Sequence, residues 1–320
     1  MNGVIIGKFY PPHKGHKFLI DTALEQVEKL TVIVCDHPSQ SIPGETRAAW
    51  LRAIHPRVEV VITPDDLPDE PVPWAQRTLD ILQSRPDAVF TSELYGEGYA
   101  EAMSCRHVLV DLDRISVPIC ATEIRAAPLD NLEYLEPCVR AHFVKRVAIV
   151  GVESTGKSTL AHDLAKCFCT TWVEEYGREY CLSKTGDWQT EDFVSIAKTQ
   201  QQNESFAAGT ANKVLFCDTN AFATSVWHRR YMGHYDEEVN GVASKDKVDL
   251  YLLTLPDFPF VQDGTRDGEH IRHEMHEWFL DRLKDQTAPI VVLCGNHEAR
   301  MKLSVDAIRN YFGLISTVTT

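Results

Sequence analysis

Near the middle of the chain the sequence reads Gly151-Val152-Glu153-Ser154-Thr155-Gly156-Lys157-Ser158-Thr159. The apolar run from Arg146 to Val150 predicts a buried strand before it, and Thr159 to Phe168 has the apolar spacing of a helix. A glycine-rich turn between a strand and a helix surrounds phosphate oxygens with backbone N–H groups and a helix N-terminus. Because the pattern G-x-x-x-x-G-K-[ST] is complete, we predict that this segment binds a nucleoside triphosphate.

Two further features define the chemistry expected at this turn. Lys157 is expected to reach the β- and γ-phosphates, and the Ser158 hydroxyl to bind Mg²⁺. The apolar run from Val214 onward predicts a strand that ends in Asp218. An aspartate at that place can bind Mg²⁺ through water or accept the proton of a substrate hydroxyl. We therefore predict Ser158 and Asp218 as Mg²⁺ ligands and ATP as a co-substrate.

The composition is typical of a globular protein that is long enough for about two domains. The chain has 320 residues, of which 44% are hydrophobic and 24% are charged. Its formal net charge of -14 argues against an extended surface for nucleic acid or anionic membrane, because such surfaces need clustered Lys and Arg. No apolar run approaches the ~20 residues of a membrane span, and the N-terminus lacks the layout of a signal peptide. We expect no nucleic-acid or membrane partner, and a homo-oligomer is left open.

The cysteines do not have the pattern of a disulfide framework. Nine are present, and Cys35, Cys217 and Cys294 lie in apolar strand-like runs, where free buried thiols are common. Cys167 and Cys169 have no partner pair at the spacing of a zinc site. A reducing cytoplasm is therefore the predicted compartment.

The N-terminal half contains a second candidate site for phosphates. Gly3 to Phe9 predicts a short strand, and His13-Lys14-Gly15-His16 follows it. Apolar residues at helical spacing come next, so this turn is expected at a helix N-terminus. Two imidazoles, one lysine and free N–H groups can converge on a polyphosphate there. A metal site is the alternative, but no carboxylate or cysteine at ligand spacing completes one.

These residues are part of a longer pattern. Gly7-Lys8-Phe9-Tyr10-Pro11-Pro12-His13-Lys14-Gly15-His16 resembles the G-[KR]-F-x-P-x-H-x-G-H signature of the nucleotidyltransferase superfamily, in its nicotinamide-mononucleotide adenylyltransferase branch. Ile119-Cys120-Ala121-Thr122-Glu123-Ile124-Arg125 is similar to the second signature of that superfamily, I-S-x-T-x-[IV]-R. The resemblance implies that catalysis involves His13, His16 and Arg125, and that ATP is bound by Gly7, Lys8, Phe9, Lys14 and Thr122. Cys120 replaces the usual serine, and Glu123 places a negative charge near the phosphates.

Between the two signatures, short apolar runs alternate with helical patterns. The expected strands are Leu30 to Cys35, Val58 to Ile62, Ala88 to Phe90 and His107 to Val110. The expected helices are Glu45 to Ile54, Trp74 to Gln83 and Gly98 to Ser104. This alternation predicts a doubly wound parallel sheet with its site at the carboxyl ends of the strands.

Two segments of this region resemble the mononucleotide pocket of the same branch. Thr91-Ser92-Glu93-Leu94-Tyr95-Gly96 is similar to its T-S-E-x-Y-G segment, which implies substrate contacts by Thr91, Ser92 and Tyr95. Trp74 resembles a pocket tryptophan that stacks on the nicotinamide ring, although a core position is equally open. Thr46-Arg47 and Asp111 to Arg114 also resemble family segments, without an assigned role.

The second half continues the α/β pattern. Trp172 to Tyr176 predicts a strand that leads into Glu174-Glu175-Tyr176-Gly177-Arg178-Glu179-Tyr180. Acids beside aromatic residues and an arginine suit a cationic aromatic ring that bears a sugar; a solvated helix start is the alternative. The candidate substrate contacts are therefore Glu175, Tyr176 and Arg178. Leu250 to Leu253 and Ile290 to Cys294 predict two more strands.

A polar, loop-like stretch lies between these two strands. It contains Asp263-Gly264-Thr265-Arg266-Asp267-Gly268 and, further on, Arg272. The mobile lid of a small-molecule kinase would bring such arginines to the transferring phosphoryl group, so Arg266 is a candidate catalytic residue and Arg272 a candidate ATP contact. The three histidines that follow lack the H-E-x-x-H pattern, which favours a solvated lid helix over a metal site for His270, His273 and His276.

The second-half motifs together resemble the ribosylnicotinamide kinase half of NadR-type bifunctional proteins, in which the adenylyltransferase half also comes first. The resemblance implies two α/β domains with doubly wound parallel sheets: a nucleotidyltransferase Rossmann-like domain over residues 1–142 and a P-loop kinase domain over residues 143–320. The implied reactions are phosphorylation of nicotinamide riboside by ATP to nicotinamide mononucleotide, then adenylyl transfer from a second ATP to give NAD and pyrophosphate.

Two other functions are left open at this stage. One is a different fusion of a nucleotidyltransferase with a kinase, for instance in coenzyme A synthesis. The other is a nucleotide sensor with impaired catalysis, which Cys120 and Glu123 would favour. NadR proteins of enteric bacteria carry a helix-turn-helix repressor domain before the adenylyltransferase. Because the first strand here starts at Gly3, we do not expect DNA-binding repression.

Overall fold

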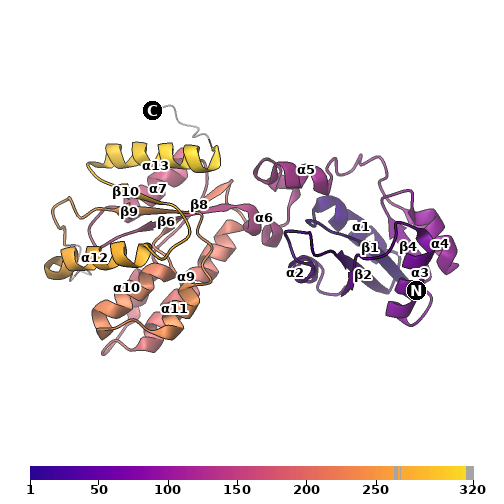
Figure 1. The fold of residues 1–320 in the computed structure, drawn as a ribbon, viewed down its shortest axis with the longest axis horizontal. Coiled ribbons are helices and arrows are strands. Elements are labelled where there is room, and N and C mark those ends of the chain that lie inside the picture. The colour runs from indigo at the N-terminus through magenta and orange to yellow at the C-terminus, as the bar shows by residue number, and fades with distance from the viewer. Residues whose placement is uncertain (263–265, 267, 315–320) are drawn as a thin grey trace. The chain divides into compact units, whose positions relative to one another are not determined.

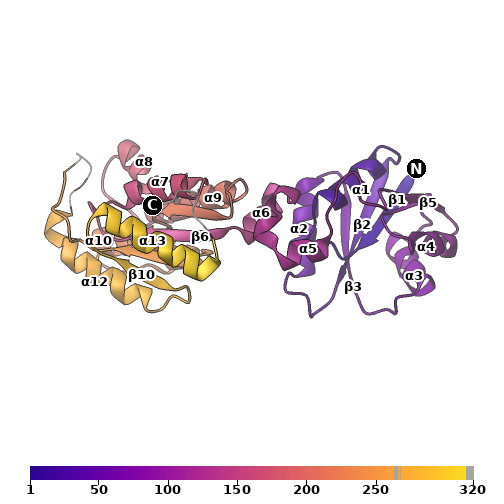
Figure 2. The same ribbon diagram turned by 90° about the horizontal axis from the view of Figure 1, so that it is seen from above.

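The computed structural model describes residues 1–262, 266 and 268–314, and the chain divides into two compact units, Met1–Val139 and Arg140–Thr320. Each unit contains one five-stranded parallel sheet with helices packed on it (Figures 1 and 2). The expected α/β class with two doubly wound sheets is therefore confirmed. None of the described helices is both long enough and apolar enough to cross a membrane.

The strand order of the N-terminal unit is β3-β2-β1-β4-β5, so the winding direction reverses between β1 and β4. The strands are β1 (Asn2–Gly7), β2 (Lys29–Asp36), β3 (Glu59–Pro64), β4 (Ala88–Thr91) and β5 (Arg106–Leu109). Open parallel sheets bind ligands beyond the carboxyl ends of the strands at such a reversal. This places the expected site of the unit just after Gly7 and Thr91.

Helices cover both faces of this sheet because side chains alternate across each strand. Ile5 packs into a core with residues of α1 and α2, whereas Val4 and Ile6 pack with residues of α3 and α4. The helices are α1 (Lys14–Leu24), α2 (Gly44–Ile54), α3 (Pro71–Leu82), α4 (Gly96–Met103), α5 (Ala121–Ala126) and α6 (Pro137–Phe143). Two short 3₁₀ helices, η1 (Pro128–Asp130) and η2 (Leu132–Tyr134), lie between the last two.

The strand order of the C-terminal unit is β10-β9-β6-β8-β7. Its strands are β6 (Lys145–Val150), β7 (Trp172–Val173), β8 (Val214–Asp218), β9 (Leu250–Thr254) and β10 (Ile290–Leu293). Central strand β6 ends at the glycine-rich turn, and β8, which pairs with it in parallel, ends at Asp218. Parallel neighbours end at the same edge of a sheet, so the register brings the turn and this aspartate together.

The helices of this unit form a layer on each face of the sheet. Figure 1 shows α7 and α13 on one side and α10 and α12 on the other. Its helices are α7 (Lys157–Cys167), α8 (Tyr176–Ser183), α9 (Thr190–Ala208), α10 (Ala221–Met232), α11 (Glu237–Ala243), η3 (Glu269–Ile271), α12 (Arg272–Leu283) and α13 (His297–Phe312).

Three expectations about this unit are wrong. The strand expected to reach Tyr176 ends at Val173, because β7 is an edge strand that pairs over only two residues, and α8 begins at Tyr176. Helix α12 is no solvated lid helix, since Met275 and Phe279 are buried in the core. Cys294 is exposed because it follows an edge strand.

The expectations for two other cysteines are confirmed, whereas most of the expected lid is not described. All nine cysteines are free thiols, and Cys35 and Cys217 are buried as expected. Asp263, Gly264, Thr265 and Asp267 of the expected lid lie outside the described residues.

A fully buried arginine holds the carboxyl ends of β1 and β2 together. Arg47 of α2 is 0% exposed and donates to the carbonyl oxygens of Cys35 (3.1 Å) and Lys8, which lie at these two ends. Its guanidinium also donates to the Ile42 carbonyl (3.0 Å) and pairs with the Asp36 carboxylate. Arg47 therefore fixes the edge of the sheet where the site is expected.

We predict that Arg47→Met lowers the free energy of unfolding of the N-terminal unit by about 3 to 5 kcal/mol, because the Asp36 carboxylate and three carbonyl groups lose their partner. Denaturant unfolding of the whole chain should show an earlier transition for this unit. Arg57→Met is the matched control, since Arg57 is exposed on the same unit. Equal transitions for the two variants would contradict the role given to Arg47.

Candidate active sites

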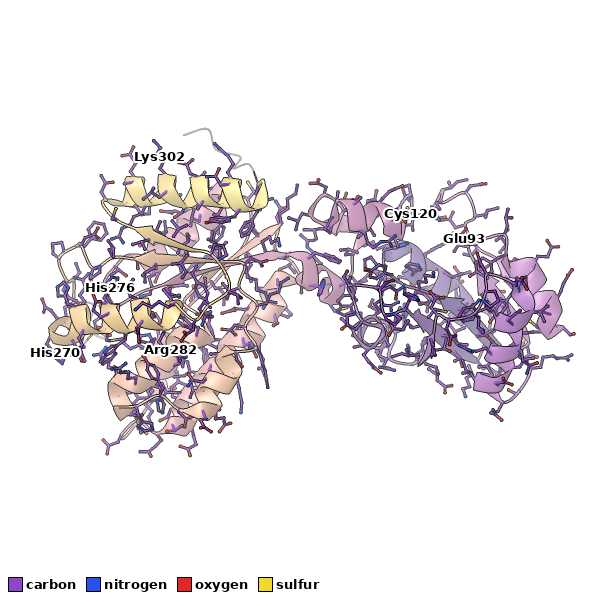
Figure 3. The ribbon with its side chains drawn as sticks, in the orientation of Figure 1. Glu93, Cys120, His270, His276, Arg282 and Lys302 are labelled. Atoms are coloured by element: carbon purple, nitrogen blue, oxygen red, sulfur yellow. The ribbon has the colours of Figure 1, made fainter. Side chains whose placement is uncertain are left out.

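The first candidate site is a cavity of about 700 Å³ at the carboxyl ends of β1 and β4. Both signatures line it, although more than a hundred positions separate His13 from Thr122 in the sequence. Of the predicted site residues, those that line the cavity are Gly7, Lys8, Phe9, His13, His16, Trp74, Thr91, Ser92, Tyr95 and Thr122. Cys120 and Glu93, which Figure 3 labels, line it as well. Lys14 and Arg125 are exposed outside this lining.

The two histidines are held as neutral hydrogen-bond donors. His13 is the N-cap of α1, and its Nδ1 accepts a hydrogen bond from the Gly15 N–H (3.1 Å). Nδ1 of His16 accepts one from the His13 N–H (3.2 Å). A ring nitrogen that accepts a hydrogen bond carries no proton, so we assign the proton of each neutral ring to Nε2.

Desolvation keeps both rings uncharged. It lowers the pKa of His13 to about 4, and the positive charge of Arg114 acts in the same direction. It also lowers the pKa of His16 well below the usual value, with added repulsion from His13 and Arg114. Near pH 7 the pair therefore offers two Nε2–H donors without adding positive charge.

The second signature packs against the first through Tyr10. Arg125 donates to the Tyr10 carbonyl (2.5 Å) and to Thr122 Oγ1 (2.9 Å). Its guanidinium lies 4.9 Å from the centroid of the Tyr10 ring, close enough for a cation–π contact. Arg125 is thereby held at an exposed position against Tyr10, which comes three residues before His13 in the first signature.

The remaining cations of this cavity are paired with carboxylates. Lys8 Nζ lies 2.9 Å from Asp65, and Arg114 Nη2 lies 3.0 Å from Glu93. Arg114 was in a segment without an assigned role, and only the fold brings it to the cavity and to the histidines. The pairing leaves backbone N–H groups and imidazoles as the main donors for phosphate.

The segment after β4 is shaped by its own side chains. Thr91 is buried, donates to the Glu93 carbonyl (2.9 Å) and contacts His107 Nε2 (2.8 Å). The Tyr95 hydroxyl donates to the Ile6 carbonyl (3.3 Å). Trp74, in the first turn of α3, is half-buried and lines the cavity. Thr91 thus fixes the backbone of the cavity wall, whereas Trp74 adds an aromatic side chain to that wall.

The second candidate site is built on the glycine-rich turn. Gly151 adopts φ +139°, and a Cβ there would lie 2.8 Å from the Thr254 carbonyl oxygen, so a side chain has no room. Thr155 Oγ1 donates to the Val152 carbonyl (2.8 Å) and closes the turn. Lys157 is buried, and its Nζ also donates to the Val152 carbonyl (3.0 Å). Thr155 and Lys157 of the turn therefore share one acceptor, the Val152 carbonyl. Gly156 and Thr159 are exposed.

Asp218 lies beside this turn with an unused oxygen. It is 2% exposed, and its Oδ1 has no hydrogen-bond partner. Burial and the negative charge of Glu175 raise the pKa of Asp218 to about 6, against the opposing effects of Lys157 and the Ser158 hydroxyl. Mg²⁺ prefers oxygen ligands, so the hydroxyl of Ser158 and the free oxygen of Asp218 fit such an ion.

A smaller cavity of about 90 Å³ adjoins Lys157 and Thr219. Four aromatic side chains contribute to its wall, namely Trp188, Phe193, Trp227 and Tyr231. The charged residues in the wall are Glu153, Lys157, Glu175, Arg178 and Arg266. Tyr176, a predicted substrate contact, is not part of this wall; its backbone N–H donates to Oε1 of Gln200 (2.9 Å), which does line the cavity.

The aromatic wall was missed by the sequence patterns. Trp188 lies 5.1 Å from Tyr231 and 5.0 Å from Phe193 between ring centroids. Half of the wall could have been found from the sequence, because Trp227 and Tyr231 are four residues apart and share one face of α10. Trp188 comes from a different segment, so only the fold could add it.

Glu153 extends from the turn to this cavity. Its Oε1 lies 3.1 Å from Arg230 Nη1, and its Oε2 accepts a hydrogen bond from the Gly268 N–H (2.8 Å). The guanidinium of Arg230 lies 5.2 Å from the Trp227 ring and 4.9 Å from the Tyr231 ring. The predicted ATP contact is therefore also part of the wall of the second cavity.

The two arginines expected in a lid lie in different surroundings. Arg266 lines the smaller cavity and donates to the Val261 carbonyl. Arg272 is buried and donates to the carbonyls of Ser154 (2.8 Å) and Phe258 (2.6 Å). Among the described residues, no three His, Cys, Asp or Glu side chains converge as metal ligands; His270 and His276 lie along η3 and α12 (Figure 3).

Comparisons with known proteins agree with this division of the chain. A family described as cytidylyltransferase-like matches residues 4–126, and a family described as an AAA domain matches residues 146–300. The trifunctional NAD biosynthesis/regulator proteins NadR of Escherichia coli (strain K12) and Salmonella typhimurium (strain LT2) are each 31% identical over 97% of this chain and 83% of theirs.

Two solved structures share the fold over the whole chain. A NadR protein in complex with NR superposes with a TM-score of 0.81 at 23% identity, and one in complex with NAD and AMP-PNP with a TM-score of 0.78 at 24% identity. Each match covers 100% of this chain and 98% of the other.

We predict that Asp218→Asn stabilises the metal-free protein at pH 7.5 while it lowers the activity of the second site at least about 100-fold. The folded state binds the Asp218 proton more tightly than the unfolded state, so this residue costs stability above pH 6 and costs less as the pH falls. The gain in unfolding free energy should be on the order of 2 kcal/mol at pH 7.5.

Thermal unfolding in a chelator at several pH values measures this effect. The gain should shrink as the pH is lowered through 6 towards the unfolded value. Asp187→Asn, an exposed aspartate of the same unit, is the control and should change neither quantity. A destabilised Asp218→Asn protein at pH 7.5 would contradict the proposed cost of this carboxylate.

Proposed function

This chain belongs to the NadR family of NAD-biosynthesis proteins, and from that premise we propose that its two sites catalyse consecutive reactions. The C-terminal unit phosphorylates nicotinamide riboside with ATP to give nicotinamide mononucleotide. The N-terminal unit then transfers AMP from a second ATP to the mononucleotide, which yields NAD and pyrophosphate. The observation that carries this assignment is that both nucleotidyltransferase signatures line one cavity, while the glycine-rich turn borders another.

In the first reaction the 5′-hydroxyl oxygen of the riboside attacks the γ-phosphorus of ATP, and ADP leaves. The carboxylate of Asp218, which lies beside the turn, is the proposed acceptor of the hydroxyl proton. Lys157 binds the β- and γ-phosphates, and the N–H groups of residues 151–159 surround them. Arg266 lies in the cavity wall, from which it can stabilise the charge on the transferring group.

We propose Mg²⁺ as the metal of this site, held by Ser158 and Asp218. When bound, it would neutralise negative charge on the phosphates. The unpartnered Oδ1 of Asp218 supports this assignment, because a buried carboxylate oxygen is rarely left without a partner.

The smaller cavity has aromatic faces that suit the nicotinamide ring of the riboside, which is a cation. Glu153 and Glu175 supply negative charge, and the rings of Trp188, Trp227 and Tyr231 supply aromatic faces. Both glutamates have arginine partners, since Arg178 lies 3.5 Å from Glu175 and Arg230 lies 3.1 Å from Glu153, so most of that charge is balanced and the aromatic faces carry the proposal. We propose that this cavity binds the riboside next to Lys157 and Asp218.

In the second reaction a phosphate oxygen of the mononucleotide attacks the α-phosphorus of ATP, and pyrophosphate leaves. We propose that the Nε2–H groups of His13 and His16 donate to the phosphates of ATP while Arg125 binds the leaving pyrophosphate. Neutral donors suit this step, since they form hydrogen bonds without trapping the product through strong charge. Trp74, Ser92 and Tyr95 form the wall proposed for the mononucleotide.

Several properties of the whole chain follow as part of this proposal. The adenylyltransferase domain covers residues 1–142 and the kinase domain residues 143–320. The nine free thiols support a reducing cytoplasm as the compartment. Family membership favours NAD synthesis over a nucleotidyltransferase-kinase fusion of coenzyme A synthesis.

We predict that His16→Ala lowers NAD formation from the mononucleotide about 100-fold or more and leaves riboside phosphorylation intact, because a positioned phosphate donor is lost in one unit only. Lys157→Ala should have the opposite effect. Separate assays of the two half-reactions measure this difference. His37→Ala and Lys166→Ala, both exposed, are the matched controls. Loss of both activities in either variant of a folded protein would rule out independent sites.

We predict that Trp188→Ala raises the KM of the kinase for nicotinamide riboside about tenfold, because an aromatic face for the cationic ring is removed. Trp188→Phe should restore most of the affinity. The KM for ATP should stay constant in both variants. Trp278→Ala controls for loss of a tryptophan outside the cavity. An unchanged riboside KM in Trp188→Ala would exclude the aromatic wall as the riboside site.

A further inference from the structure

Two consecutive carbonyl oxygens of the glycine-rich turn accept hydrogen bonds from buried arginines. The Ser154 carbonyl accepts one from Arg272 Nη2 (2.8 Å), and the Thr155 carbonyl accepts one from Arg300 Nη1 (2.6 Å). Arg272 begins α12, whereas Arg300 lies in the first turn of α13. The two residues are 6% and 2% exposed, so neither can leave its place without a change in the surrounding core.

Arg300 joins the turn to the loops that follow β9 and β10. Its Nε donates to the Gly295 carbonyl (3.0 Å), and its Nη2 donates to the Leu255 carbonyl (2.8 Å) and pairs with the Asp257 carboxylate. A guanidinium can serve these acceptors together because its five N–H donors have fixed directions in one plane. An ammonium group at the same place could reach only part of them.

The direction of these carbonyls decides where the turn points its donors. A peptide group is planar and trans, so its C=O and N–H point in opposite directions. Fixing the Ser154 carbonyl therefore sets the direction of the Thr155 N–H, and fixing the Thr155 carbonyl sets that of the Gly156 N–H. These are among the N–H groups that a G-x-x-x-x-G-K turn offers to phosphates.

The backbone of the turn needs this support. Ser154 adopts φ +57°, a left-handed conformation that a residue with a Cβ adopts only where the surroundings enforce it. Arg272 binds the carbonyl of this same residue from the side of α12. This hydrogen bond is therefore one of the contacts that support the left-handed conformation of Ser154.

We propose that Arg300, together with Arg272, is a positioning residue for ATP binding: it sets the direction of the turn's N–H groups without touching a phosphate itself. The charge of Arg300 is balanced by Asp257, so its role is to direct the peptide groups and not to attract the polyanion. This proposal rests on the kinase function proposed above for the C-terminal unit, and it assigns Arg300 a role that no sequence motif indicates.

The test is the pair Arg300→Lys and Arg272→Lys in riboside phosphorylation. We expect the KM for ATP to rise about tenfold or more in each, since a charge-assisted hydrogen bond is lost, while the KM for riboside stays constant. In the double variant the KM for ATP should rise by less than the product of the two single increases, because both arginines act on adjoining peptide groups. Arg309→Lys, an exposed arginine of the same helix, is the control.

Two inhibitors separate phosphate positioning from a general structural role. Inorganic tripolyphosphate should inhibit Arg300→Lys more weakly than the wild type by the same factor as the change in the KM for ATP. Adenosine, which lacks phosphates, should inhibit both equally. Equal increases in the KM for ATP and for riboside, or weaker inhibition by adenosine, would overturn the proposal.

Two measurements cover the case of a poorly folded variant or an inactive kinase. Asp257→Asn keeps the shape of the partner of Arg300, so it should raise the KM for ATP by less than Arg300→Lys does and leave the KM for riboside constant. An unchanged KM for ATP in this variant would count against the proposal. If the wild type fails to phosphorylate riboside, the proposed kinase function is wrong. Calorimetric titration with tripolyphosphate in a His16→Ala background then still tests Arg300→Lys, and equal affinities for the two proteins would overturn its role.

Discussion

Phosphate groups have to be bound by a chain whose formal net charge is -14, and this constraint shapes both sites. General attraction by a basic surface cannot do so, so binding depends on local donors. In each unit the donors follow the carboxyl end of a central parallel strand: His13 caps α1 after β1, and Lys157 begins α7 after β6. Helix N-termini and backbone N–H groups supply partial positive charge at these places without changing the net charge.

The two units satisfy this constraint by different chemistry. In the N-terminal cavity Lys8 and Arg114 are paired with carboxylates, and the histidines are neutral, so hydrogen bonds dominate. In the C-terminal unit the cations Lys157 and Arg272 are buried around the turn, so charge and hydrogen bonds act together. The difference fits the proposed reactions, because one site has to release pyrophosphate and the other has to neutralise a transferring phosphoryl group.

The glycine-rich turn also links the two substrates of the proposed kinase. Glu153 belongs to the turn, yet its carboxylate contacts Arg230, whose guanidinium lies against the aromatic wall. Glu175, on the other side of the wall, acts on the pKa of Asp218. Glu153 and Glu175 therefore connect the wall of the smaller cavity with the phosphate-binding turn and with Asp218 through short, partly buried contacts.

Much of this organisation could be predicted because it depends on residues that are close in sequence. The strands β1, β6 and β8, the turns after them and the donors His13, Lys157 and Asp218 are determined by short runs whose backbone geometry is local. The apolar stripe of Met275, Phe279 and Leu283 in α12 is a local pattern too. The charged residues between them favoured a solvated helix in the sequence analysis, but in the structure the stripe is buried. The edge strand β7 could not be bounded, because pairing with β8 decides its length.

By itself the sequence determined the two α/β units and the type of ligand, since strand-turn-helix motifs carry their own phosphate geometry. Only the tertiary structure decided which distant side chains complete each site. Arg300 meets Thr155 across 145 positions, and Trp188 meets Tyr231 from a separate segment. Neither pair has a local pattern, because packing at the carboxyl edge of a sheet depends on how all the strands are ordered and not on any one of them.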